Sequence, residues 1–173
     1  MKKLLIVVDY QNDFVDGVLG FKRAQEIENN IINKINKYKE NNDEIIFTLD
    51  THYEDYMSTI EGENLPIPHC IKGSKGHEIY GKVKELSLNY PLIEKETFGS
   101  KDLIKYIENK EYSEIELIGV VTNICVISNA VLVKAIHPNT KISVDASCSA
   151  SNDEVMEEKA LDVLENLHIK VIR

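Results

Sequence analysis

A lone cysteine, Cys125, lies where an apolar strand-like run, Ile115–Val120, gives way to a helical pattern. At the start of a helix, unpaired backbone N–H groups and the helix dipole favour a thiolate over a thiol. The position therefore predicts a nucleophile, although a cysteine in an apolar stretch is more often a core residue. Acyl transfer also needs oxyanion donors, and the backbone N–H groups of Val121 and Cys125 are the candidates, presented by a sharp turn or a cis peptide.

Two other segments contain candidate partners for this thiol. Asp9 follows the apolar run Leu4–Val8, and Lys95 follows the short run Leu92–Glu94. A free thiol, with a pKa of about 8.5, is mostly protonated at neutral pH, so it needs a nearby charge or base. We expect Lys95 to supply a positive charge. We expect Asp9 to accept the thiol proton and later donate it to a leaving amine.

A second group of residues has the types and spacing of metal ligands. Asp50 and His52 are two positions apart just after the strand-like run Glu44–Leu49, so both side chains point to one face of an extended chain. His69 follows a stiff, proline-containing loop. One carboxylate and two imidazoles suit zinc, iron or manganese, and Glu61 can add a further oxygen. The alternative is a surface loop that holds two unrelated histidines.

The other cysteines and histidines are assigned no chemistry. Cys70 is adjacent to His69, and neighbouring side chains of an extended segment point to opposite sides, which favours a structural role. The three cysteines form an odd set without paired spacing, so reduced thiols are expected. The remaining histidines are placed near a helix start, at a helix end and in the final loop or strand: His77, His137 and His168.

Apolar strand-like runs alternate with helical patterns along the whole chain. Strands are expected at Leu4–Val8, Glu44–Leu49, Leu92–Glu94, Ile115–Val120, Lys141–Val144 and Ile169–Ile172. Helices are expected at Ala24–Lys39, Glu78–Leu88, Lys101–Glu108, Asn123–Ile136 and Asp153–Leu167. This alternation indicates an α/β fold with a mostly parallel sheet and helices on both faces, in one domain spanning residues 1–173. Ligands bind beyond the carboxyl ends of parallel strands, so the candidate residues that follow strands should meet at one rim.

The composition argues against several kinds of partner. A formal net charge of −9 disfavours nucleic acid and anionic membranes, because both need a basic face. No apolar run approaches the roughly 20 residues that span a bilayer. The apolar part of the N-terminal segment is too short for a signal peptide, which favours a cytoplasmic protein.

Five motifs, taken together, resemble the isochorismatase-like cysteine hydrolases, and most closely the nicotinamidases, also called pyrazinamidases. They occur in the family's order and span nearly the whole chain. They are Asp9-Tyr10-Gln11-Asn12-Asp13-Phe14, Asp50-Thr51-His52, Pro68-His69-Cys70, Lys95-Glu96-Thr97-Phe98-Gly99-Ser100 and Gly119-Val120-Val121-Thr122-Asn123-Ile124-Cys125-Val126.

The resemblance implies a three-layer α/β/α fold with a doubly wound sheet. It implies a catalytic triad of Asp9, Lys95 and Cys125, and an oxyanion hole at the backbone of Val121 and Cys125, with a cis peptide before Val121. Family members often form oligomers, so a homo-oligomer is the expected assembly.

The resemblance also implies a divalent metal ion, with zinc expected and iron or manganese as alternatives. Asp50, His52 and His69 would bind it, and Glu61 falls near a further carboxylate ligand of some nicotinamidases. The ion would hold the pyridine nitrogen of nicotinamide, and Phe14 would line the ring pocket. One departure is Asn123, which stands where many nicotinamidases have an aspartate two residues before the nucleophile.

Three functions are compatible with these residues. The leading hypothesis is an amidohydrolase that converts nicotinamide to nicotinate and ammonia through a thioester on Cys125. The runner-up is a related cysteine hydrolase acting on another small amide, a carbamoyl compound or a ureido compound, which need not anchor a ring nitrogen to a metal. The third is a non-catalytic binding module, because a fold does not fix a function.

Overall fold

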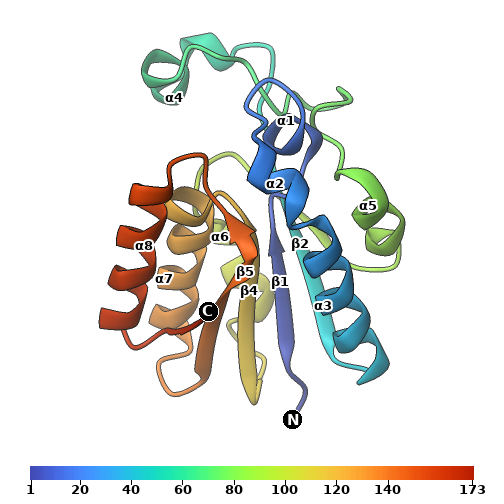
Figure 1. Cartoon of the computed structure of the whole chain (residues 1–173), viewed down its shortest axis with the longest axis vertical. Helices are drawn as coiled ribbons and strands as arrows, with labels where there is room; N and C mark the ends of the chain where they lie inside the picture. The colour runs from blue at the N-terminus through green and yellow to red at the C-terminus, as the bar shows by residue number, and fades with distance from the viewer.

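A six-stranded parallel sheet runs through the middle of the molecule (Figure 1). In this computed structural model, which describes residues 1–173, the strands lie in the order β3-β2-β1-β4-β5-β6. Every neighbouring pair is parallel. The strands are β1 (Leu4–Val8), β2 (Glu44–Asp50), β3 (Leu92–Lys95), β4 (Glu114–Val120), β5 (Lys141–Ala150) and β6 (Lys170–Ile172). The predicted parallel α/β sheet is confirmed.

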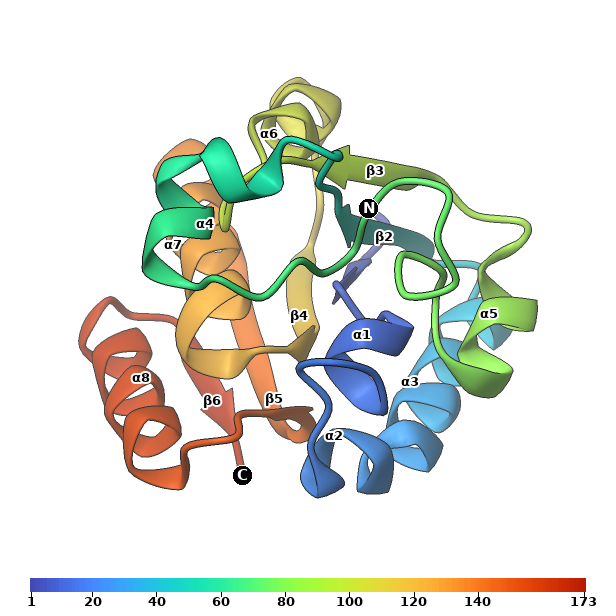
Figure 2. The same cartoon turned by 90° about the horizontal axis from the view of Figure 1, so that it is seen from above.

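Helices cover both faces of this sheet and complete three layers (Figures 1 and 2). One face is covered by α1 (Asn12–Val15), α2 (Lys22–Glu26), α3 (Glu28–Glu40) and α5 (Gly81–Ser87). The other is covered by α6 (Lys101–Ile107), α7 (Ile127–Ile136) and α8 (Glu154–Asn166). The short η1 (Tyr56–Ser58) and α4 (Ile60–Asn64) lie above the carboxyl ends of the strands. No helix is long and apolar enough to cross a membrane.

The central strand β1 shows why its sequence is a continuous apolar run. Leu5 and Val7 pack into the core beneath α1, α3 and α5. The alternate residues Leu4, Ile6 and Val8 pack into the core beneath α6, α7 and α8. Side chains of a strand point alternately to opposite faces, so a strand covered on both faces has no position at which a polar residue would reach water.

The strand order reverses between β1 and β4, and this is where the sheet forms a ligand-binding crevice. The chain leaving β1 passes to one face and the chain leaving β4 passes to the other, so the two segments diverge. Gly119 near the end of β4 has a φ of +114°, and a Cβ there would collide with the backbone carbonyl of Val8. Glycine is required for the ends of these two strands to approach so closely.

Several helices and strands have other bounds than the sequence predicts. The helix expected at Ala24–Lys39 is two helices, α2 and α3, that meet at Ile27. The strand expected to end at Val144 continues to Ala150, because its pairing with β4 shifts register and then resumes at Ser149. The residues between these two paired stretches form a bulge in strand β5, and their polar composition is typical of a loop.

The helix expected at Glu78–Leu88 begins only at Gly81, because Tyr80 is extended. The helix expected from Asn123 begins as a π-helical turn, η2 (Thr122–Val126), and becomes α-helical at Ile127.

Candidate active site

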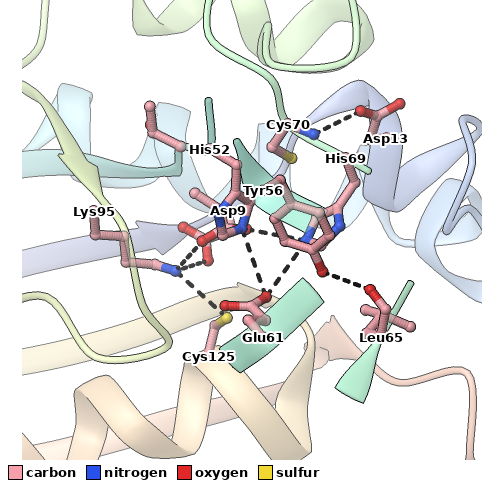
Figure 3. A network of polar contacts seen from close by, with 12 residues as sticks. Asp9, Asp13, His52, Tyr56, Glu61, Leu65, His69, Cys70, Lys95 and Cys125 are labelled. Carbon is pink, nitrogen blue, oxygen red and sulfur yellow. Dashed lines mark hydrogen bonds and ion pairs between the residues drawn. The ribbon is translucent and has the colours of Figure 1, made fainter. Parts of the chain in front are cut away.

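The three predicted catalytic side chains meet at the carboxyl edge of the sheet, although they come from three separate strands (Figure 3). Lys95 Nζ lies 2.6 Å from Asp9 Oδ2 and 3.5 Å from Cys125 Sγ. The same ammonium lies 3.1 Å from Asp50 Oδ1. All four residues are buried. An ammonium therefore lies between the thiol and two carboxylates, out of contact with bulk water.

Asp9 is held in place by strand β2. Its backbone N–H donates to the Thr48 carbonyl at 3.2 Å, and the Thr48 hydroxyl donates to Asp9 Oδ1 at 2.7 Å. Asp9 also has a positive φ of 47°, a conformation that non-glycine residues adopt rarely and that is enriched at functional sites. The second carboxylate oxygen is left for the ion pair with Lys95.

Burial and neighbouring charges both shift the pKa values of Cys125, Asp9 and Lys95. Burial raises the pKa of Cys125 well above its usual value; Lys95 opposes the rise, and Asp9 adds to it. Burial likewise raises the pKa of Asp9, against the attraction of Lys95. Burial alone would lower the pKa of Lys95, but Asp9 and the other negative groups outweigh it, so the amine stays protonated. Complete burial thus opposes the effect of the helix start, which favours the thiolate, and Asp9 lies next to the same ammonium as the sulfur.

The nucleophile lies in the π-helical turn η2, whose backbone is folded tightly at its start. The Val120–Val121 peptide bond is cis, as predicted. The N–H groups of Ile124 and Val126 both donate to the Val121 carbonyl, at 3.1 and 3.2 Å. This turn places the backbone of Val121 and Cys125, the predicted oxyanion donors, at the wall of one cavity.

Asn123, the departure from the nicotinamidase pattern, bonds to Ser151. Its Oδ1 accepts a hydrogen bond from the Ser151 hydroxyl at 2.6 Å, and its backbone N–H donates to the Ser151 hydroxyl oxygen at 3.4 Å. The side chain therefore links the nucleophile turn to the loop after β5.

The four predicted metal-ligating residues form one cluster beside the triad (Figure 3). His52 Nε2 lies 3.0 Å from Asp50 Oδ2 and 3.6 Å from Glu61 Oε1. His69 Nε2 lies 3.4 Å from the same Asp50 oxygen and 3.7 Å from the same Glu61 oxygen. Two ligand atoms that are about 2.1 Å from one ion at a tetrahedral angle are about 3.4 Å apart. The donor types and their spacing thus fit a divalent transition metal ion.

Neighbouring groups orient these donors. The carbonyl of Ile67 accepts a hydrogen bond from His69 Nδ1 at 2.8 Å, so the lone pair of that ring is on Nε2 and faces the cluster. The Tyr56 ring packs against both imidazoles, with centroid distances of 4.7 Å to His52 and 5.1 Å to His69. Burial alone would raise the pKa of Asp50, but Lys95 and the imidazoles hold it well below its usual range.

Two residues of the first motif, which had no predicted role, hold the chain that carries the candidate metal donors. The Gln11 amide donates to the Asp50 carbonyl and accepts from the Asp50 N–H, both at 2.8 Å. Asp13 Oδ2 accepts a hydrogen bond from the Cys70 N–H at 2.7 Å, next to His69. A run of polar side chains directly after a buried strand was the available signal for both roles.

The histidines assigned no chemistry lie outside the cluster. His77 was expected near a helix start, but it precedes α5 and its Nε2 lies 2.8 Å from the Thr51 hydroxyl. His137 caps the end of α7, and His168 lies in the loop before β6. Cys70 is fully buried and packs in the core, in agreement with a structural role.

Asn129 is a further buried residue that the sequence did not single out. Its amide donates to the carbonyls of Cys125 at 2.8 Å and Phe98 at 3.0 Å, and accepts from the Ser100 N–H at 2.9 Å. The side chain therefore joins the helix that carries the nucleophile to the segment that follows Lys95.

A cavity of about 200 Å³ lies between the thiol and the metal-type cluster. Phe14 lines it, as expected, and its ring centroid lies 5.5 Å from that of His69. The wall also includes Asp50, Glu61 and Cys125. Most of the lining is apolar: Phe14, Leu19, Phe21, Leu65, Phe98, Val121 and Ile124. A flat, apolar ring with one polar edge fits such a space.

A doubly wound sheet that gathers an acid, an ammonium and a thiol at its crevice defines a cysteine hydrolase of the α/β type. More specifically, the chain belongs to the isochorismatase family, because residues 3–173 match the isochorismatase domain.

Individual relatives agree with this assignment. The isochorismatase family protein PncA of Bacillus subtilis is 36% identical over 143 residues, which are 76% of this chain and 78% of that protein. The nicotinamidase of Saccharomyces cerevisiae is 23% identical over 214 aligned positions, covering 98% of this chain and 99% of that protein.

Solved structures share the fold. The nicotinamidase/pyrazinamidase PncA from Bacillus subtilis has a TM-score of 0.89 at 30% identity, covering 100% of both chains. The pyrazinamidase of Pyrococcus horikoshii in complex with zinc has a TM-score of 0.85 at 25% identity, covering 100% of this chain and 99% of that one.

Proposed function

We propose that this protein hydrolyses nicotinamide to nicotinate and ammonia. The observation that carries the proposal is the meeting of two groups at one small apolar cavity. Cys125 lines this cavity, and its sulfur contacts Lys95, which pairs with Asp9. Three of the four candidate metal donors line the same cavity: Asp50, Glu61 and His69. The nicotinamidases and pyrazinamidases among the relatives support the same substrate class.

Asp9 and Cys125 would carry out the acylation step. As the Cys125 sulfur attacks the amide carbon, Asp9 accepts the thiol proton, and the negative charge develops on the amide oxygen. The backbone N–H groups of Val121 and Cys125 stabilise that oxyanion. Asp9 then donates the proton to the nitrogen, the carbon–nitrogen bond breaks, ammonia leaves and a thioester remains. Lys95 stabilises the negative charge on Asp9 before the proton transfer and on the sulfur as it attacks.

Hydrolysis of the thioester would use the same base. Asp9 accepts a proton from a water molecule as that water attacks the thioester carbonyl. The carbon–sulfur bond then breaks, the sulfur recovers the proton from Asp9, and the carboxylic acid that forms releases the second water proton to solvent and leaves as nicotinate. Each turnover consumes one water and returns the triad to its starting protonation state.

The metal-type cluster would select the pyridine ring. Asp50, His52 and His69, with Glu61 as a fourth donor, would hold a divalent ion that supplies a Lewis-acidic site for the ring nitrogen. We propose zinc, which the Pyrococcus horikoshii pyrazinamidase contains, with iron and manganese as alternatives. Phe14 would pack against the ring. This cluster favours nicotinamide over the carbamoyl and ureido compounds of the runner-up hypothesis, because those lack a ring nitrogen to bind.

We also propose that the protein works in the cytoplasm as a homo-oligomer. Three free cysteines fit the reducing cytoplasm, and the product nicotinate fits a role in NAD salvage. Exposed apolar side chains on α7, namely Val131 and Leu132, fit a homo-oligomer.

The test is ammonia release from nicotinamide and pyrazinamide by the purified protein, with metal content measured in parallel. Cys125→Ala should abolish release while leaving metal content unchanged. His69→Ala should remove most of the bound metal and weaken substrate binding. Full turnover by Cys125→Ala would refute the mechanism, and full turnover by metal-free protein would refute the role of the cluster.

A further inference from the structure

A second, larger groove adjoins the cavity that holds the thiol. The groove measures about 800 Å³, against about 200 Å³ for the cavity. The two spaces have four lining residues in common: Glu61, Leu65, Phe98 and Ile124. These four residues, the shared rim, come from α4, the segment after it, the loop after β3 and the nucleophile turn.

The shared rim is open rather than packed beneath other residues. Phe98 is 43% exposed and Ile124 is 37% exposed, although both are large apolar side chains that also face the cavity. A ring bound in the cavity can therefore carry a substituent that crosses the rim. The volume of the groove exceeds what the ring itself needs, so this space is available for such a substituent.

The lining of the groove is suited to a positive charge. Asp55 and Glu96 line it, are exposed, and take part in no ion pair. No lysine or arginine lines the groove. Tyr53, 44% exposed, and Phe98 add aromatic side chains to the same wall. Unpaired carboxylates and aromatic faces both attract cations.

We propose that this groove binds a cationic substituent on the ring of the amide substrate. The substrate class then extends from nicotinamide to pyridine carboxamides that carry an ammonium-bearing side group. This inference rests on the proposed function, because the ring must lie in the cavity with its carboxamide at Cys125.

The test compares four amides: nicotinamide, and its derivatives with an aminomethyl, a hydroxymethyl or a carboxyl group at ring position 5. At low ionic strength, we expect kcat/KM for the aminomethyl compound to exceed that for the carboxyl compound by about tenfold or more, with the neutral compound between them. The preference should shrink in about 1 M salt, because Asp55 and Glu96 are exposed to solvent. Equal values for the cationic and anionic compounds would overturn the proposal.

A pair of double variants assigns the preference to the groove. Asp55→Asn with Glu96→Gln should remove most of the discrimination and leave nicotinamide turnover within about twofold. The matched control is Glu54→Gln with Glu63→Gln, which removes two nearby exposed acids that do not line the groove. Equal loss of discrimination in both double variants would mean that net charge, and not the groove, attracts the substituent.

The proposed function and the groove can fail separately. If nicotinamide is not hydrolysed, the proposed function is wrong. Calorimetric binding of the same four compounds to the metal-loaded protein then decides the groove. Tighter binding of the aminomethyl compound that the Asp55/Glu96 variant abolishes supports the groove, and the absence of that difference rejects it.

Discussion

The molecule contains two lysines, one buried and one half-buried, that each lie between two buried carboxylates, and the two clusters behave differently. Lys95 lies 2.6 Å from Asp9 and 3.1 Å from Asp50. On the α3 face of the sheet, Lys34 lies 2.6 Å from Glu116 and 2.7 Å from Asp145. The ion-pair distances are almost the same, so the difference must come from what else each carboxylate contacts.

In the Lys34 cluster, the carboxylates have additional donors. The Tyr38 hydroxyl donates to Glu116 at 2.7 Å, and the Ser147 N–H and hydroxyl both donate to Asp145, at 2.9 and 2.6 Å. Burial alone would raise the pKa of Asp145, but Lys34 and Ser147 lower it overall. These charges are stabilised, and the cluster is structural.

In the Lys95 cluster, the balance is reversed for Asp9. This residue is completely buried, its Oδ2 has only the ion pair with Lys95, and burial raises its pKa despite that ion pair and one hydrogen bond from Thr48. A carboxylate that holds its charge weakly exchanges a proton readily, which is what a general acid–base residue requires. The comparison teaches that a buried ion pair becomes reactive when its carboxylate is completely buried and has few hydrogen-bond donors besides the ammonium.

The test with the largest expected effect neutralises one aspartate in each cluster. Asp9→Asn should lower kcat for nicotinamide by about a thousandfold, because no other base adjoins the thiol. Asp145→Asn should leave kcat within about twofold. Steady-state ammonia release measures both. A large loss of kcat in Asp145→Asn would show that the two clusters are not functionally separate.

The second test removes each ammonium. Lys34→Met should lower the free energy of unfolding by about 3–5 kcal/mol, because it leaves two buried carboxylates unpaired, while kcat changes little. Lys95→Met should lose activity as well as stability. Urea denaturation and ammonia release on the same preparations separate the two effects. Retained stability in Lys34→Met would contradict the structural role of that cluster.

The third test uses pH. The pKa of Asp145 is lowered in the folded protein, so its contribution to stability is fully present above the unfolded value of about 3.9 and is lost as pH falls through the folded value. Asp145→Asn should therefore be less stable than wild type by about 1–3 kcal/mol near pH 7, and the difference should shrink below about pH 4. Urea denaturation across this range measures it, and a difference that grows on acidification would reverse the assigned sign.

The smallest expected effect comes from Tyr38. Tyr38→Phe removes the hydroxyl that donates to Glu116 and should cost about 1–2 kcal/mol of unfolding free energy, with activity unchanged. Tyr112→Phe is the matched control, since its hydroxyl donates at 3.1 Å to Glu44, which is less buried than Glu116. A larger cost in the control would contradict the importance of burial.

The sequence predicted the parts of the fold that depend on continuous patterns. The buried strand Leu4–Val8 was placed with its observed bounds, because a strand covered on both faces must be apolar throughout. The rule that ligands bind at strand carboxyl ends then brought Asp9, Lys95 and Cys125 together correctly. The strand that continues to Ala150 was cut short because its polar bulge has the composition of a loop.

The site residues that the sequence did not predict hold other segments in place through hydrogen bonds to the backbone. Asn129 bonds backbone groups of two other segments, and nothing in its local sequence reveals those partners. Gln11 lies in a polar run after a buried strand, which indicates a role but not its partner, the backbone of Asp50. For Cys125, local sequence shows a helix start, which favours the thiolate, whereas complete burial, which raises the pKa of the thiol, is seen only in the folded chain.

The long connection between β2 and α5 has one further consequence (Figure 2). His52, Glu61 and His69 all lie within this one stretch of chain, whereas the proton-transfer residues are dispersed across three strands. Under the proposed function, three of the four metal donors would lie on one contiguous segment, while Asp50 and Phe14 lie outside it. Exchanging that segment between homologous chains should therefore change which amides are accepted, while the reactive sulfur and its partners stay with the recipient sheet.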